Sequence, residues 1–122
     1  MLRWLAAKFR ERSASPLAKW SVGFANDFIV TSDGSETTRK LLLGELRKVV
    51  VQTDDSGPWG ADVVYYLFSG HTEPAAVFPL EAQGCDDFVA WLSTLPGYND
   101  RELARAMGST SVARFVVFEP KS

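Results

Sequence analysis

The sequence WSVGF at residues 20–24 alternates apolar residues with small or polar ones, and this period of two is typical of a β-strand. Ala25-Asn26-Asp27 predicts a turn, after which residues 28–32 return as a second strand. Asp33-Gly34 is a strong turn signal. The first part of the domain is therefore predicted to be a β-hairpin that leads into further strands.

The apolar positions of residues 36–50 fit either a helical stripe or two strands. Gly44 interrupts the stripe, and the sequence VVVQT strongly prefers an extended conformation. We therefore predict strands over residues 36–42 and 46–53, joined by a tight turn near Gly44-Glu45. A helix in this region is the alternative.

A nearly continuous apolar run, VVYYLFS, occupies residues 63–69 and predicts a strand deep in a sheet. SGHTEP at residues 69–74 predicts a turn, and AAVFPL at residues 75–80 predicts another strand. ARFVVFE at residues 113–119 is apolar on both faces. It is therefore predicted to be a last strand that joins the sheet.

Two helices are predicted between these last strands. The first has apolar residues at helical spacing, and these should pack against the sheet: Cys85, Phe88, Val89, Leu92 and Leu95. Leu95-Pro96-Gly97 predicts its end. The second helix should begin after Asn99, which can cap it, with Glu102 completing a capping box. Tyr98 and Leu103 occupy the hydrophobic-staple positions.

The N-terminal segment predicts a further helix over residues 2–12, with Leu2, Leu5, Ala6 and Phe9 on one side. Ser13-Ala14-Ser15-Pro16 should break it. Such a helix could touch a membrane or a partner, but packing on the domain, or a frayed chain end, is the simpler interpretation. We expect residues 1–17 to form this helix and a linker, followed by a single α+β domain over residues 18–122.

The order of elements predicts an α+β fold. Consecutive strands with short turns predict an antiparallel meander or partly closed barrel of about six to seven strands. The N-terminal helix and the two C-terminal helices should cover it.

The chain also resembles an uncharacterised family of small bacterial proteins. The resemblance rests on the elements WSVGF at residues 20–24, VQTDDSGP at 51–58 followed by DV at 62–63, LPGYND at 95–100 and AM at 106–107. The architecture is similar to a pleckstrin-homology-like domain, in which a bent antiparallel sheet is closed by a C-terminal helix. Phosphoinositide-binding domains of that kind use a cationic loop between the first two strands. Ala25-Asn26-Asp27 carries no cation, so we expect no phosphoinositide ligand.

Charge is segregated along the chain. Residues 1–20 carry five lysines and arginines against one acid, a net charge of +4. Residues 49–100 contain no lysine or arginine, and their acids give a net charge of −8: Asp54, Asp55, Asp62, Glu73, Glu81, Asp86, Asp87 and Asp100. Nucleic-acid binding needs clustered cations, so we expect no nucleic-acid partner. The acids form either an ordinary solvated surface or an acidic docking face.

The loop TDDSGPWGAD at residues 53–62 lies inside this acidic span. The loop that links the two predicted strands is longer than the common hairpin loop of about 2–5 residues. Turn chemistry accounts for the Asp, Ser, Gly and Pro residues, but not for Trp59. This tryptophan is either a lid over the open end of the sheet or an interface anchor. The candidate partner-binding residues are Asp54, Asp55, Trp59 and Asp62.

The sequence gives little support for a catalytic or metal-binding site. His71 is the one histidine and lies in a turn, where no fixed acid is expected to orient it. Cys85 is the one cysteine and falls on the apolar stripe of a helix, so a buried core role is favoured. One cysteine and one histidine cannot supply a tetrahedral zinc site, and the acids lack EF-hand spacing. We expect no cofactor and no metal.

The composition is typical of a cytoplasmic globular domain, because the single cysteine suits a reducing compartment and no apolar run approaches the roughly 20 residues of a membrane span. We expect a module that binds another protein through its acidic surface. A toxin-neutralising immunity protein is one concrete form of such a module. The alternative is a small-ligand binder or an enzyme with a pocket at the mouth of the sheet.

Overall fold

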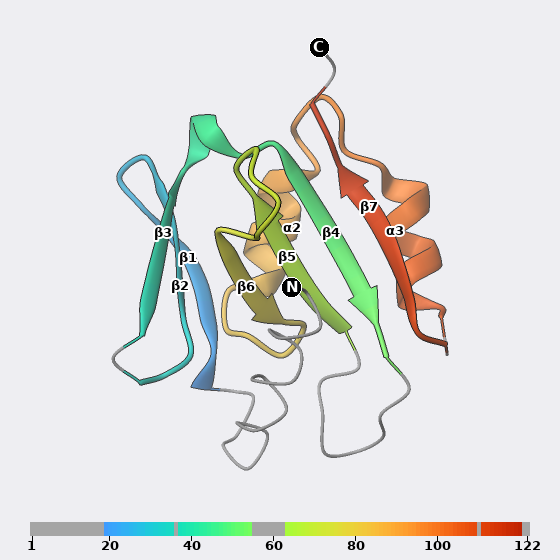
Figure 1. The fold of residues 1–122 in the computed structure, drawn as a ribbon, viewed down its shortest axis with the longest axis horizontal. Helices are drawn as coiled ribbons and strands as arrows, with labels where there is room; N and C mark the ends of the chain where they lie inside the picture. The colour runs from blue at the N-terminus through green and yellow to red at the C-terminus, as the bar shows by residue number, and fades with distance from the viewer. Residues whose placement is uncertain (1–18, 36, 55–62, 110, 121–122) are drawn as a thin grey trace.

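The computed structural model describes residues 19–35, 37–54, 63–109 and 111–120. These residues form two antiparallel sheets and two α-helices, so the predicted α+β class is confirmed (Figure 1). The elements in chain order are β1 (Ser21–Ala25), β2 (Phe28–Ser32), β3 (Thr38–Leu42), the 3₁₀ helix η3 (Leu43–Glu45), β4 (Lys48–Thr53), β5 (Val63–Phe68), β6 (Ala76–Pro79), α2 (Cys85–Leu92), α3 (Asp100–Met107) and β7 (Ala113–Phe118). The predicted N-terminal helix lies outside the described residues.

The first sheet is a three-stranded meander in the order β1-β2-β3. The predicted turn between β1 and β2 forms, and Asn26 takes the left-handed conformation there, with a φ of 56°. The ambiguous region after β2 forms strands, as predicted. The predicted tight turn is η3, the single 3₁₀ turn between β3 and β4.

The second sheet has the order β6-β5-β4-β7. Its central position explains why β5 is apolar at nearly every residue, because both faces of the strand are buried. The last strand returns beside β4, where Val51 pairs with Phe115. The prediction that β7 joins the sheet is therefore confirmed.

Seven strands form, within the predicted number of about six to seven, but the described residues build neither a single meander nor a closed barrel. The chain instead divides into two sheets at η3, which has extended residues on both sides. Leu46 follows η3 and is buried, which anchors the start of β4 away from β3. Both edges of β4 are then occupied, one by β5 and the other by β7.

The main core lies between one face of the second sheet, the first sheet and the helices. In Figure 1, α2 lies behind the second sheet and α3 lies beside β7. The ring of Phe78 stacks on Tyr65 at 5.0 Å and meets the edge of Phe88 at 5.3 Å. Phe88 and Leu92 are fully buried, which confirms the predicted inward face of α2.

The start of α3 follows the prediction more closely than the end of α2 does. The Oδ1 atom of Asn99 accepts a hydrogen bond from the backbone N–H of Glu102 at 3.0 Å, so Asn99 caps α3 as predicted. Glu102 does not complete the predicted capping box, because the N–H of Asn99 donates to the carbonyl of Val117 at 2.8 Å. Tyr98 and Leu103 both pack against the core. The first helix ends at Leu92, before Leu95, although Leu95 still packs against the core. Neither described helix has the length and apolar content needed to cross a membrane.

Candidate partner-binding surface

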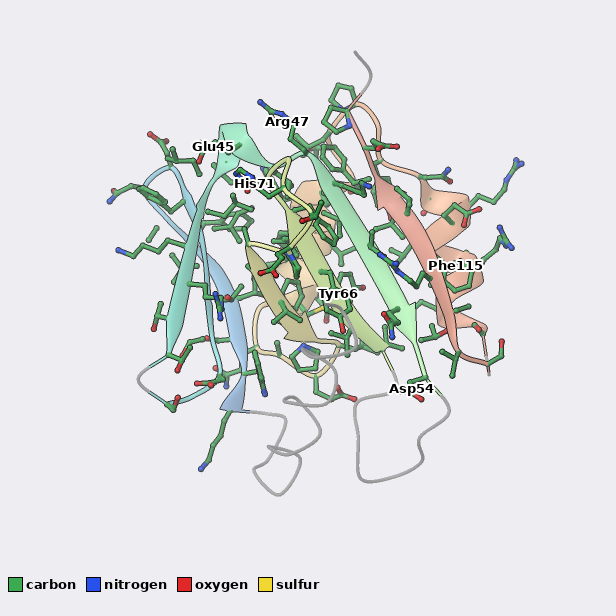
Figure 2. All side chains as sticks on the ribbon, viewed as in Figure 1. Glu45, Arg47, Asp54, Tyr66, His71 and Phe115 are labelled. Atoms are coloured by element: carbon green, nitrogen blue, oxygen red, sulfur yellow. The ribbon has the colours of Figure 1, made fainter. Side chains whose placement is uncertain are left out.

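The predicted site begins at Asp54, which directly follows β4 and is half-buried. Asp55, Trp59 and Asp62 lie outside the described residues, so the choice between lid and anchor for Trp59 stays open. Figure 2 shows Asp54 at the lower end of the second sheet, where β4 ends. The connection from β4 to β5 leaves the sheet at this end.

A buried hydroxyl group fixes the end of β4. Thr53 is only 1% exposed, and its Oγ1 donates a hydrogen bond to the backbone carbonyl of Ser111 at 2.6 Å. The same oxygen lies 3.2 Å from the Oγ of Ser109. The strand end is therefore tied to the segment between α3 and β7, which holds the backbone next to Asp54 in place.

Glu81 lies at the same end of the sheet. It follows Leu80, whose N–H donates to the carbonyl of Val63 at 3.0 Å, at the start of β5. Because β5 starts where β4 ends, Asp54 and Glu81 extend from the same end of the second sheet. Both side chains have access to solvent.

The start of α2 brings two more acids to this end. Its N-cap, Gly84, has a φ of 88°, and a Cβ there would lie 2.0 Å from the carbonyl oxygen of Val22. Glycine is therefore required at position 84, and the start of α2 packs closely against Val22 in β1. Asp86 and Asp87 are exposed in the first turn of the helix, where the N-terminal dipole stabilises negative charge.

We call this region the acidic end and define it by four residues: Asp54, Glu81, Asp86 and Asp87. Three described cations lie at the same end, because Lys19 lies two residues before β1, Arg39 pairs with Thr31 near the end of β2 and Arg114 pairs with Gln52. Among the residues that the structure describes, acidic groups still outnumber basic ones here. The sequence predicted these four acids as part of a single span but could not show which of them share an end.

Two other acids of the predicted span lie elsewhere. Glu73 lies in the turn after β5, next to the start of β4, because Phe68 pairs with Lys48. Asp100 begins α3 beside Tyr98, which bridges to Phe118 at the same far end. Figure 2 shows this separation, since His71, from the turn that carries Glu73, lies at the opposite end from Asp54. The acidic span is thus divided between two ends of the domain.

The two residues considered for catalysis, His71 and Cys85, lie in different environments. His71 is exposed in its turn, as expected from the sequence. Cys85 is buried, and burial raises the pKa of its thiol to about 11, although a hydrogen bond from Tyr65 acts in the opposite direction. Burial also raises the pKa of the Tyr65 phenol. Both groups stay protonated at neutral pH, so the predicted core role of Cys85 is supported. The sequence carried no signal that would have paired it with Tyr65.

Two hollows in the described surface are open to solvent. One, of about 650 Å³, is lined by Tyr98, Asn99, Asp100 and Arg101. The other, of about 600 Å³, lies between α3 and β7 and includes Arg105 and Arg114. Arg105 pairs with Glu102 at 2.6 Å and lies over the ring of Phe115, so its charge is already engaged. Within the described residues, no three acids, histidines or cysteines gather to hold a metal ion.

Comparisons with models of protein families, with curated proteins and with solved structures gave no significant match for this chain.

Proposed function

We propose that this chain is a cofactor-free module that binds a basic protein through its acidic end. The observation that carries the proposal is the convergence of acids from three separate parts of the chain: Asp54 after β4, Glu81 after β6, and the first turn of α2. A toxin-neutralising immunity protein is one concrete form of this function, because it would cover a cationic active site.

Exposed carboxylates of this kind act mainly on the rate of association. Each pairwise attraction is small in water, but several like charges at one end add to a field that steers a cationic partner. The effect should weaken with salt, since the Debye length is about 8 Å at physiological ionic strength and about 3 Å at 1 M. The same field should repel the phosphates of nucleic acids and inositol lipids. We therefore propose that neither is a ligand.

The experiment compares two charge-reversed variants with the same change in net charge. The test variant carries Glu81→Lys and Asp86→Lys at the acidic end. The control carries Glu73→Lys and Asp100→Lys at the far end. Each pair combines one loop acid with one acid from the first turn of a helix, so the cost to the helix dipole is matched.

The immobilised full chain and both variants are exposed to lysate of the source cells, and the captured proteins are quantified at low and high salt. We expect a basic protein that is captured by the wild type and the control, is lost from the test variant, and is released by salt. Loss from both variants alike, or capture that is indifferent to charge and salt, would contradict the proposal.

The alternative function is a small-ligand binder or an enzyme, and the hollow between α3 and β7 is the feature that would serve it. Ser109 and Arg114 offer polar groups there. The wide opening of the hollow and the pairing of Arg105 with Glu102 favour the macromolecule-binding function instead. A pocket for a small molecule usually encloses most of its ligand.

The proposal also includes a fold type and a cellular location. A pleckstrin-homology-like architecture is supported by antiparallel strands packed with C-terminal helices, while β7 after α3 departs from it. A cytoplasmic location is supported by the single cysteine of the chain, Cys85, which cannot form an intramolecular disulfide.

A further inference from the structure

The outer face of the second sheet is a second apolar surface, separate from the main core. It is formed by alternate residues of three neighbouring strands: Val50, Val64, Tyr66, Phe68 and Val77. Val50 pairs with Tyr66, and Tyr66 pairs with Val77, so these side chains form a row across the sheet. Tyr66 is 1% exposed and Val50 is 2% exposed. Side chains this deeply buried must have other atoms packed over them.

The two described helices cannot supply that cover. The side chains of β4 that face them are Val49 and Val51, which belong to the main core with Phe88 and Leu92. Successive residues of a strand point to opposite faces, so Val50 points away from the helices.

From the described part of the chain outside the sheet, Trp20 packs against the outer face. Lys48 adds a contact at one corner, where its Nζ lies 5.7 Å from the centre of the Phe68 ring. Trp20 stands next to the start of the described chain, beside this face.

We propose that residues 2–12 pack as an amphipathic helix on the outer face of the second sheet. Their apolar stripe of Leu2, Leu5, Ala6 and Phe9 matches an apolar surface in need of cover. A helix of this length spans about 16 Å, enough to cross three strands spaced about 4.8 Å apart. The linker over residues 13–18 can reach about 20 Å, which leaves freedom to dock from Trp20. This inference is independent of the acidic end and its proposed partner.

The docking is tested first by two neighbouring substitutions in the full chain. At 100° per residue, Ala6 falls on the apolar stripe and Ala7 on the opposite side. We expect Ala6→Glu to lower the urea midpoint of unfolding, because it would bury a carboxylate against the sheet. Ala7→Glu should leave the midpoint unchanged. Equal midpoints for both variants would overturn the proposal.

The location is tested by a spin label attached to Ala7→Cys, with methyl NMR signals as the readout. Cys85 is buried and should not take the label. We expect the label to broaden the methyl signals of Val64 and Val77. A control label at Arg101→Cys, exposed in the first turn of α3 on the other face of the sheet, should leave them sharp. Sharp signals with the label at position 7 would overturn the placement.

A membrane is the other candidate occupant of the amphipathic segment. The full chain is therefore sedimented with vesicles of phosphatidylcholine and phosphatidylserine. We expect it to stay in the supernatant, because its apolar stripe is already covered. Co-sedimentation together with loss of the broadening at Val64 and Val77 would assign the segment to the membrane and overturn the proposal.

Discussion

Leu92 is the last residue of α2, and its side chain is fully buried between that helix and the core. Leu92→Ala removes three carbon atoms from this site. At about 0.8 kcal/mol per buried CH₂, the lost transfer free energy is about 2.4 kcal/mol. The surrounding aromatic rings can close the cavity only in part, so the total loss should fall at about 2–5 kcal/mol.

Urea unfolding of the full chain measures this loss. With an m-value of about 1–3 kcal/mol/M, a loss of about 3 kcal/mol lowers the midpoint by about 1–3 M. Leu80→Ala is a matched control, because it removes the same atoms from a side chain that is 37% exposed. The control should cost about 1 kcal/mol or less. Equal midpoint shifts for the two variants, or no shift for Leu92→Ala, would refute the placement of α2.

Three further predictions concern Asn99 and Cys85. Asn99→Ala should cost roughly 1 kcal/mol, because it leaves the N–H of Glu102 without its cap, whereas Asn99→Asp should retain most of the stability in the same urea assay. The folded chain should react with iodoacetamide at pH 8 far more slowly than the urea-unfolded chain, because the pKa of Cys85 rises from 9.0 to about 11 on folding. Since the folded chain then holds a proton that the unfolded chain releases, stability should fall as the pH rises from 9 to 11. A stability that is constant or rises over that range would contradict this assignment.

Local pattern was enough to predict most of the elements, because each depends on residues close in sequence. The turn at Asn26 and the cap at Asn99 are such cases, and both formed as expected. The end of α2 was misplaced for a local reason that spacing does not reveal. The hydroxyl of Thr94 donates to the carbonyl of Trp91 at 2.6 Å, and such bonds compete with continuation of the helix.

Pairing between distant strands could not be predicted in the same way. Nothing near Val51 in the sequence indicates that Phe115 is its partner. Phe24 alternates with Val22 along β1, but Val22 is buried whereas Phe24 is 43% exposed and its ring meets Trp91 at 5.2 Å.

Prediction of the candidate site was also limited, because it depends on the pairing of distant strands. The sequence showed a run of acids without cations, but register decides that Glu81 lies at the same end of the sheet as Asp54 whereas Glu73 lies at the far end. The hydrogen bond from Thr53 to Ser111 joins residues 58 positions apart, and no short motif signals it.

The late position of β7 has a consequence for synthesis of the chain. β4 is a strongly apolar strand whose second partner arrives 60 residues later, as Thr53 and Ala113 show. At about 5–20 residues per second, a ribosome needs about 3–12 s to make that stretch. During that time β4 has one open edge, which can pair with the same strand of another nascent chain. The interval before β7 docks is therefore the period in which this protein is most exposed to aggregation, and fast translation or a chaperone bound at β4 should raise the yield of folded chain.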